Sequence, residues 1–414
     1  MHIGTDFHNN EADVENATRI VEQYRENSRL ADVAPAVKRR AGYTHMTDDK
    51  AVNGMTDKAG SAFADMARRD GSGQTAVQAR PSIREAARLR MLVLDGAMGT
   101  MIQARRLKEA DFRGERFAAH TANVSGCNDL LCLTRPDVIL DIHRRYLDAG
   151  ADIIETNTFN AQSVSMSGCL LEGVCREINL EACRIARSAA DVYTRRDPSK
   201  PRFVAGSVGP TAKTCSVTAG TTQTGRGGSG YRTLLKAYAG QAAALIEGGV
   251  DALLIETISD TMNARAAIEA ARSEARKAGR SVPLMLSFTI ADDKGHNMLG
   301  QDICRFVADV MDDDILSVGV NCCSDTSMAV PLLARLGEET PCLISLYPNA
   351  GMPDAEGHYA LTPEEMQRAM WNIAERHVLD IMGGCCGTTD AHIRRLTDIA
   401  GSVNGPVITP HNAL

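Results

Sequence analysis

The chain has 414 residues, 12 cysteines and a formal net charge of −7, without a long basic run. This charge excludes nucleic acid and an anionic membrane surface as natural partners and leaves small molecules or other proteins. No segment reaches the roughly 18 apolar residues of a membrane span, and the N-terminus lacks the layout of a signal peptide, so we expect a cytoplasmic protein with reduced thiols rather than a disulfide framework.

Residues 1–80 are dominated by polar and charged side chains and lack the short apolar runs found later in the chain. Apolar residues recur at helical spacing over 12–31, which predicts one helix, and the Gly-Ser segment at 70–73 is typical of a linker. We therefore interpret 1–80 as a polar, partly disordered N-terminal extension.

From residue 82 onward, short apolar runs alternate with longer amphipathic segments. Eight runs rich in Val, Ile or Leu predict strands at 91–94, 152–155, 203–207, 252–256, 284–289, 316–320, 342–346 and 378–382. Amphipathic segments predict helices at 136–149, 177–194, 231–248, 261–278, 302–312, 327–336, 363–376 and 390–403. Eight such units predict a (β/α)8 TIM barrel over 82–405, followed by a tail at 406–414; a doubly wound open sheet is the alternative.

Polar or otherwise unusual residues stand at the end of every predicted strand. These strand ends are 95–100, 155–159, 206–210, 256–257, 287–289, 321–323, 347–351 and 383–386. The C-terminal ends of barrel strands form one ring around the active site, so residues far apart in the sequence can meet there. This placement favours the barrel over the open sheet.

Cys385 and Cys386 are adjacent and are flanked by glycines. Two neighbouring cysteines cannot easily bridge each other, but glycines let the backbone turn so that both reach one metal ion. The pair Cys322-Cys323 offers a third thiolate, and spacing alone does not choose between its members. Three thiolates leave one tetrahedral position of zinc open, as in a catalytic site.

The other features of the ring suit an amino acid that carries a thiol. Zinc would deprotonate an entering thiol, Asp95 and Glu256 suit an ammonium group, and the turn at 96–99 offers N–H groups to a carboxylate. Asp95 is also explained as a turn former, and Thr156 and Asn157 either contact a ligand or satisfy loop backbone. The ten histidines form no ligand pattern, and the remaining cysteines are interpreted as small buried residues: Cys127, Cys132, Cys169, Cys175, Cys183, Cys215, Cys304 and Cys342.

The combined motifs closely resemble the homocysteine S-methyltransferase family over about residues 82–405. The motifs are DGAMGT at 95–100, ETNTF at 155–159, Asn321-Cys322, YPNAG at 347–351 and GGCCGTT at 383–389. The segments 110–117 and 128–131 resemble in particular the N-terminal, homocysteine-binding module of cobalamin-dependent methionine synthase.

This resemblance implies a zinc-bearing barrel in which three cysteines bind the metal and homocysteine is methylated to methionine. It assigns zinc to Cys322, Cys385 and Cys386, with Asn349 in the fourth position until the homocysteine sulfur displaces it. By the same match the substrate amino group would be held by Asp95 and Glu256 and its carboxylate by the turn at Gly96 and Ala97, with Thr156 and Asn157 as further substrate contacts.

Three departures from the family pattern concern the methyl donor. The segment 218–228 lacks the longer acidic, proline-containing loop, and Leu299 stands where the family usually has a serine. Neither a folate barrel nor an Asp-x-His-x-x-Gly corrinoid motif is found, because the sequence after Asp390-Ala391-His392 continues differently. We therefore expect methylcobalamin to be held by a separate corrinoid- and methyltetrahydrofolate-binding module or protein. The alternatives are an S-methylmethionine-dependent enzyme and a non-catalytic module that binds zinc and homocysteine.

Overall fold

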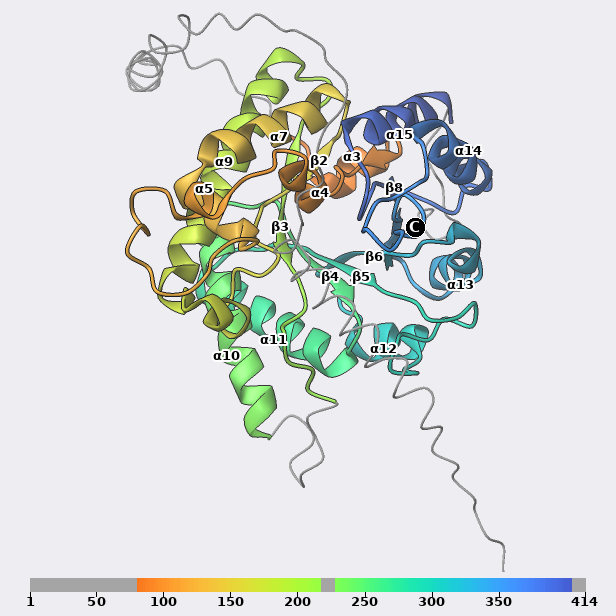
Figure 1. Ribbon diagram of the computed structural model, residues 1–414. Helices are drawn as coiled ribbons and strands as arrows, with labels where there is room; N and C mark the ends of the chain where they lie inside the picture. Colours follow the sequence, from red (N-terminus) through yellow and green to blue (C-terminus); the bar gives the residue numbers. More distant parts are fainter. Residues whose placement is uncertain (1–79, 217–227, 404–414) are drawn as a thin grey trace, which may run out of the picture. The chain divides into compact units, whose positions relative to one another are not determined.

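A computed structural model describes residues 80–216 and 228–403 as a closed barrel (Figure 1). Eight parallel strands pair in the order β1-β8-β7-β6-β5-β4-β3-β2, and a parallel bridge between Leu94 and Ile153 brings β1 against β2. The strands are β1 (Leu92–Val93), β2 (Ile153–Glu155), β3 (Phe203–Val208), β4 (Ala252–Ile258), β5 (Leu284–Phe288), β6 (Ile315–Asn321), β7 (Leu343–Tyr347) and β8 (Ile381–Met382). The predicted (β/α)8 barrel is confirmed, and the open sheet is wrong.

Among the described residues, eight longer helices surround the strands, close to the predicted segments (Figure 1). They are α7 (Pro136–Asp148), α9 (Cys175–Arg196), α10 (Ser229–Glu247), α11 (Thr261–Lys277), α12 (Ile303–Val310), α13 (Val330–Glu339), α14 (Pro363–Ala374) and α15 (Asp390–Ser402). Shorter helices are α3 (Ile83–Ala87), α4 (Met98–Gln103), α5 (Glu109–Arg113), α6 (Leu131–Thr134) and α8 (Ser163–Met166), with 3-10 turns η2 (Asn128–Leu130), η3 (Ser167–Cys169), η4 (Glu172–Val174) and η5 (Thr326–Met328). The predicted helix at 12–31, the linker at 70–73, the segment 217–227 and the tail lie outside the described residues.

Local sequence explains where several helices begin. Thr362 and Glu365 form a capping box around Pro363, so each satisfies a backbone N–H at the start of α14. The Asp260 side chain accepts from Met262 N at the start of α11. These caps fix the points at which the chain leaves the loops at the mouth of the barrel.

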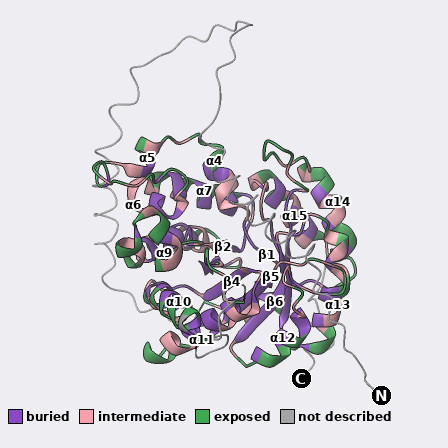
Figure 2. Cartoon of the chain, turned by 60° about the horizontal axis from the view of Figure 1, so that its bottom comes forward, coloured by how far each residue is buried: buried purple, intermediate pink, exposed green. Residues whose placement is uncertain are grey.

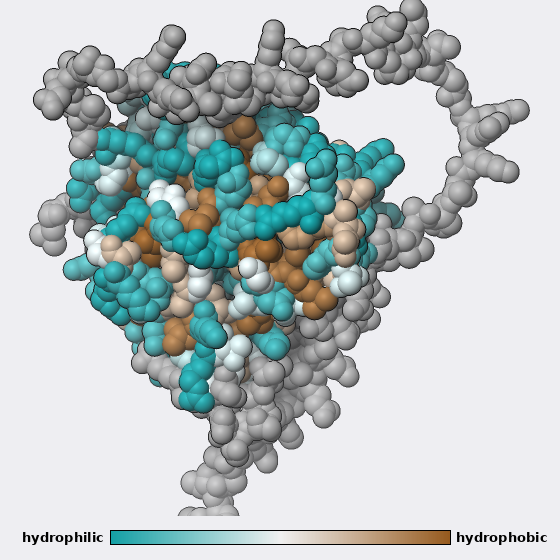
Figure 3. Space-filling view, turned by 90° about the vertical axis from the view of Figure 1, so that its left-hand side faces the viewer, coloured by the Kyte–Doolittle hydropathy of each residue, from teal (hydrophilic) through white to brown (hydrophobic). Residues whose placement is uncertain are grey.

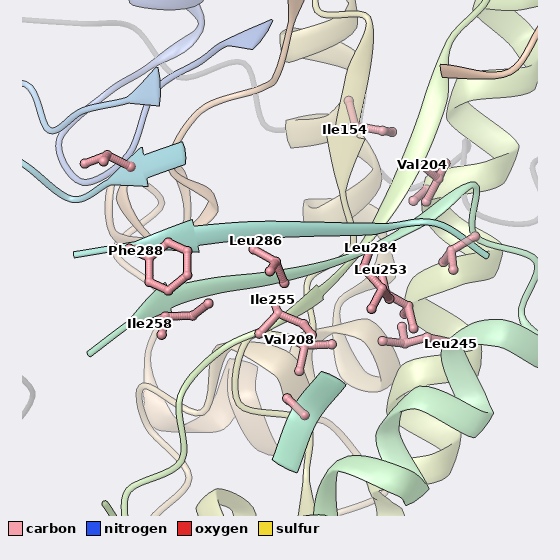
Figure 4. Close-up of a cluster of buried hydrophobic side chains, with 14 of the residues drawn as sticks. Ile154, Val204, Val208, Leu245, Leu253, Ile255, Ile258, Leu284, Leu286 and Phe288 are labelled. Carbon is pink, nitrogen blue, oxygen red and sulfur yellow. The ribbon is translucent and has the colours of Figure 1, made fainter. Parts of the chain in front are cut away.

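The strand side chains form an inner and an outer apolar layer. Figure 2 colours the central strands mainly as buried. Residues of alternate parity, such as Phe203 and Ala205, fill the barrel interior, whereas their neighbours pack outward against the helices. Figure 4 shows part of the outer layer, in which Ile154, Val204, Leu253, Ile255, Leu286 and Phe288 belong to one cluster. The continuous burial explains why each strand reads as an unbroken apolar run.

The short helix α3 closes the N-terminal end of this interior. Ile83, Ala86 and Ala87 belong to the same buried cluster as the inward-facing strand residues. Arg84 Nη2 donates to the carbonyl of Ile315 at 3.1 Å, where β6 begins. A capping box between Ser82 and Glu85 starts the helix. Sequence analysis assigned no helix here, because five residues are too few for a periodic pattern.

Buried aspartates hold the N-terminal ends of neighbouring strands in register. Asp152 accepts a hydrogen bond from the Val93 N–H at 2.9 Å, and Asp380 accepts one from the Ile344 N–H at 2.7 Å. Each carboxylate satisfies a strand N–H that lies beyond the regular ladder. Strands aligned at this end also align at the opposite end, where the polar residues lie.

The expectation of isolated, reduced, buried thiols is wrong for Cys127 and Cys169, which form a disulfide. Both are half-buried; Cys127 precedes η2 and Cys169 ends η3. These two segments meet only in the folded chain, so spacing could not reveal the pair. The other cysteines interpreted as buried are buried at Cys132, Cys183, Cys304 and Cys342, and half-buried at Cys175 and Cys215.

Hydrophilic and hydrophobic side chains are interspersed on the face of the molecule that Figure 3 turns toward the viewer. Within the described residues, no helix combines the length and the apolar character needed to cross a bilayer.

Candidate active site

Three cysteine thiols meet at the C-terminal end of the barrel. Cys322 follows β6, and Cys385 and Cys386 follow β8. The Sγ atoms of Cys322 and Cys385 are 2.8 Å apart, those of Cys385 and Cys386 are 4.0 Å apart, and all three lie within 4.8 Å of one another. These separations bracket the edge of about 3.8 Å that a zinc tetrahedron with Zn–S bonds of about 2.3 Å requires. The three thiols therefore suit one metal ion.

The structure distinguishes the two members of the Cys322-Cys323 pair. Cys322 adopts a left-handed backbone conformation with a φ of 57°, and its side chain faces Cys385. Cys323 is buried in the outer apolar layer, and this burial raises the pKa of its thiol to about 12. Only Cys322 is placed to share a metal with the later pair.

Asn349 lies beside these thiols, after β7. Its Nδ2 donates to the carbonyl of Cys322 at 3.1 Å, and the N–H of the next residue, Ala350, donates to the carbonyl of Cys386 at 2.9 Å. Asn349 is buried, and its Oδ1 has no hydrogen-bond partner among the described residues. A buried carbonyl oxygen without a partner is costly unless a ligand completes it, which fits a fourth metal ligand.

The loop after β7 also covers the cysteine pair from outside. Pro353 pairs with Tyr359 in a short antiparallel bridge, and the Tyr359 ring lies over Gly387. A Cβ atom at Gly387 would come within 2.2 Å of the Tyr359 ring, and its φ is 81°. Only glycine satisfies both the close approach and the left-handed backbone at this position.

The thiols stabilise one negative charge among themselves. Hydrogen bonds from Cys322 and Cys385 hold the pKa of the Cys386 thiol well below its usual range, and the Tyr359 hydroxyl contributes a further hydrogen bond. Hydrogen bonds to Cys322 and Cys386, together with burial, raise the pKa of Cys385 well above its usual range. A cation is therefore needed to keep all three deprotonated.

Three carboxyl groups lie at the C-terminal ends of β1, β2 and β4: those of Asp95 and Glu256 are buried, and that of Glu155 is half-buried. Asp95 follows β1, Glu155 ends β2, and Glu256 lies in β4. Asp95 Oδ2 accepts from the Glu155 N–H at 3.1 Å, whereas Asp95 Oδ1 is buried without a partner among the described residues. The Ser207 hydroxyl donates to Glu256 Oε1, and Glu256 also shares a hydrogen bond with Glu155.

Burial opposes ionisation of all three carboxyl groups. It raises the pKa of Glu256 to about 7 and those of Asp95 and Glu155 well above their usual ranges, and mutual repulsion raises the last two further. Such a cluster favours a cation among its members, because a positive charge would let the carboxylates ionise.

Glu155 belongs to this cluster, although the sequence motifs predict substrate contacts only for Thr156 and Asn157 in the same segment. The alternation of side chains along a strand indicates this role. Glu155 lies two residues after Ile153, which faces the barrel interior, so the Glu155 side chain faces the interior as well. An acidic residue at an inward position of a strand end indicates a site.

Thr156 and Asn157 make their visible contacts within the loop. The Thr156 hydroxyl is 2.6 Å from that of Thr158 and accepts from the Ser207 N–H at 3.0 Å. Asn157 Nδ2 donates to the carbonyl of Asn128 at 2.8 Å. These hydrogen bonds fit the alternative in which both residues satisfy loop backbone.

The glycine turn after β1 is held by the loop after β8. The Ala97 N–H donates to the Thr388 hydroxyl at 3.1 Å, so a substrate carboxylate would have to share this donor. A Cβ atom at Gly96 would approach Thr388 and Tyr146 to 2.9 Å, so no larger residue fits this turn. The turn thus brings backbone N–H groups close to both Asp95 and the cysteine loop.

Leu299, which stands where the family usually has a serine, lies in a turn that is held by other hydrogen bonds. The Leu299 N–H donates to Asn297 Oδ1 at 3.0 Å, and Gln301 Oε1 accepts from the Thr261 N–H at 3.0 Å. The turn is held without a serine hydroxyl.

His392 Nε2 contacts the carbonyl of Leu361 at 3.0 Å, and its Nδ1 contacts Thr389, so the ring has a structural role at the start of α15.

Comparison with known proteins places this site in context. A family model described as homocysteine S-methyltransferase matches residues 92–400. Three structures of the homocysteine methyltransferase MmuM from Escherichia coli are similar in fold. The metallated form has a TM-score of 0.57 and 23% identity over 75% of this chain and 96% of that chain. The oxidised form has a TM-score of 0.58 and 23% identity over 74% and 95%, and the apo form 0.54 and 22% over 75% and 96%.

Proposed function

The chain belongs to the homocysteine S-methyltransferase family and is a methyltransferase, and from this premise we propose that it transfers a methyl group to homocysteine in a zinc-dependent reaction that gives methionine. The observation that carries this proposal is the placement of three thiols within 4.8 Å of one another on the barrel rim that also bears the carboxyl groups of Asp95, Glu155 and Glu256. One group of side chains suits a metal and the thiol, and the other suits the amino group.

Cys322, Cys385 and Cys386 would hold the zinc ion, with Asn349 Oδ1 in the fourth position without substrate. Zinc bound there lowers the pKa of an incoming thiol and so keeps it as a nucleophilic thiolate at neutral pH. The Tyr359 hydroxyl forms a hydrogen bond with Cys386. This bond orients the Cys386 thiolate and partly screens its charge. The three thiols are half-buried at the mouth of the barrel.

Asp95, Glu155 and Glu256 would bind the substrate ammonium group. The ammonium would replace the proton shared by Glu155 and Glu256, and the Ser207 hydroxyl keeps Glu256 Oε1 oriented. The carboxylate of the substrate would lie against the turn at Gly96 and Ala97. Because the carboxyl groups lie at the ends of β1, β2 and β4 and the thiols follow β6 and β8 on the same rim, the site would select an amino acid with a terminal thiol.

The methyl donor that we propose is methylcobalamin, held by a corrinoid- and methyltetrahydrofolate-binding module or protein. The motif segments at 110–117 and 128–131 support this assignment. A small donor such as S-methylmethionine is the second candidate. A zinc- and homocysteine-binding module without turnover is the third.

Methionine formation from homocysteine separates these candidates. The purified, zinc-loaded chain is given free methylcobalamin in one reaction and S-methylmethionine in a parallel one. Product only with methylcobalamin supports the proposed donor, and product only with S-methylmethionine supports the second candidate. Homocysteine binding without product from either donor contradicts the enzymatic proposal.

Two variants test the two halves of the site separately. Cys385→Ser should lose most bound zinc, measured by a colorimetric chelator, because two thiolates hold the metal far less tightly than three. Glu256→Gln should retain zinc but bind homocysteine about tenfold more weakly, since it loses one charged partner of the ammonium. Full zinc retention in the first variant, or unchanged homocysteine affinity in the second, would contradict the corresponding assignment.

A further inference from the structure

We propose that Asn321, the last residue of β6, is a positioning residue that joins the thiol group to the carboxylate group of the site. It is fully buried, and its side chain contacts Thr257 in β4, Ser287 in β5, and the thiols that follow β6 and β8. This inference rests on the proposed function, because it gives Asn321 a task toward the thiolates and the bound ammonium.

The hydrogen bonds of Asn321 determine which end of its amide faces the sulfurs. The backbone N–H of Thr257 can only donate, and it lies 3.0 Å from Asn321 Oδ1; the Ser287 hydroxyl donates to the same oxygen at 2.8 Å. The oxygen is thus committed to two donors, so the NH2 group must occupy the other side. A flipped amide would set its NH2 group against the Thr257 N–H, which cannot accept a hydrogen bond, so this donor fixes the orientation.

That NH2 group is directed at two of the three thiols. Asn321 Nδ2 lies 3.5 Å from Cys322 Sγ and 3.8 Å from Cys385 Sγ. N–H donors favour the thiolate form of a sulfur and reduce its charge, which matters in a site that also holds three carboxyl groups. Asn321 therefore fixes the positions of both sulfurs relative to β4 and β5.

The same amide holds two strained backbone positions. Thr257 has a φ of 55° and Cys322 a φ of 57°, values that are rare for residues other than glycine and particularly for β-branched threonine. Asn321 contacts Thr257 twice, through its N–H and through its hydroxyl at 2.8 Å. The pairing of β4 with β5 shifts register between Ile255 and Ile258, the stretch that contains Glu256.

These contacts link the two halves of the site mechanically. The irregular end of β4 directs Glu256 into the barrel mouth, and Asn321 fixes that end relative to Cys322 and Cys385. The separation between the ammonium pocket and the sulfurs is then set by a rigid amide rather than by the loops. A strained conformation that persists at a functional position is expected when surrounding contacts hold it.

The test uses cobalt in place of zinc, because bound Co2+ reports thiolate ligation through its absorption. Asn321→Asp keeps the shape and both acceptor contacts but replaces the N–H donors with an anion beside two sulfurs. We expect its Co2+ affinity to fall about 10- to 100-fold, the usual effect of losing a partner of a metal ligand. The sulfur-to-cobalt charge-transfer band should move to longer wavelength, because thiolates without N–H donors release electrons more easily. Homocysteine affinity should fall as well.

Ser287→Ala is the matched control, since it removes a partner of the same amide but leaves both sulfur contacts. Its band should remain at the wild-type position. Thr257→Gly tolerates the left-handed backbone and removes the hydroxyl that accepts one of the two Nδ2 protons. Because more N–H donation is then left for the sulfurs, its band should move to shorter wavelength, and this variant is the test if the Asn321→Asp protein does not fold. A folded Asn321→Asp protein with wild-type cobalt affinity and band position would overturn the inference. Absence of cobalt binding by the wild-type chain would instead overturn the proposed metal site.

Discussion

His143 illustrates how a single buried residue sets a property of the whole chain. It lies on α7 and is 0% exposed, and neither ring nitrogen has a hydrogen-bond partner among the described residues. Burial lowers its pKa to about 4. The folded state therefore favours the neutral ring, whereas in the unfolded chain the ring binds a proton near pH 6.5.

The resulting pH dependence has a definite sign. On acidification the unfolded state binds the proton first, so the stabilisation is complete above pH 6.5 and is lost as the pH falls toward 4. We expect this residue alone to lower the free energy of unfolding by about 2 kcal/mol between pH 7 and pH 5. Urea unfolding at both pH values checks this, with His143→Leu as the comparison. An unchanged pH dependence in that variant would show that His143 is not the cause.

At the scale of elements, the loop after β7 and the loop after β8 depend on each other through Gly387. Gly387 and Gly357 both have a left-handed backbone, with φ values of 81° and 82°. Alanine at Gly357 meets no atom within 4 Å, whereas alanine at Gly387 would collide with the Tyr359 ring. The two substitutions therefore separate backbone strain from displacement of the loop.

We expect Gly357→Ala to cost about 1 kcal/mol of unfolding free energy, from the left-handed backbone alone. Gly387→Ala should cost at least about 2 kcal/mol and should also weaken metal binding, because Tyr359 is pushed away from Cys386. Thermal unfolding and chelator competition measure the two effects. Equal stability and equal metal affinity of the two variants would contradict the proposed dependence between these loops.

At the scale of the whole molecule, α3 determines where the barrel begins. The family match starts at residue 92, yet Ile83, Ala86 and Ala87 belong to the buried interior of the barrel. The boundary at 82 stays a prediction, and two shortened chains test it. A chain that begins at residue 81 retains the Ser82 cap and α3, whereas one that begins at residue 90 leaves the interior open at its N-terminal end.

We expect the chain from residue 81 to keep the unfolding midpoint of the full protein. The chain from residue 90 should lose at least about 3 kcal/mol, since it removes a fully buried isoleucine and two buried alanines. Denaturant unfolding of both proteins, followed by circular dichroism, gives the comparison. Equal midpoints for the two shortened chains would show that α3 is dispensable.

Much of the fold and part of the site could be predicted from local sequence. Strands buried on both faces are continuous apolar runs, and helices such as α14 carry their caps in the adjacent residues. The cysteine pair at 385–386 signals a metal because its flanking glycines are contiguous with it. Such features depend on neighbours in the chain, so they can be recognised without knowing the fold.

The sequence by itself determined the barrel, its number of strand and helix units, the family and the residue types at the strand ends. Only the tertiary structure decided that Glu155 joins the carboxyl cluster, that Cys322 rather than Cys323 faces the later pair, that Cys127 meets Cys169, and how the Asn321 amide is oriented. These outcomes depend on the direction of single side chains. That direction follows from strand register and closure of the sheet, which are set by contacts between segments far apart in the chain.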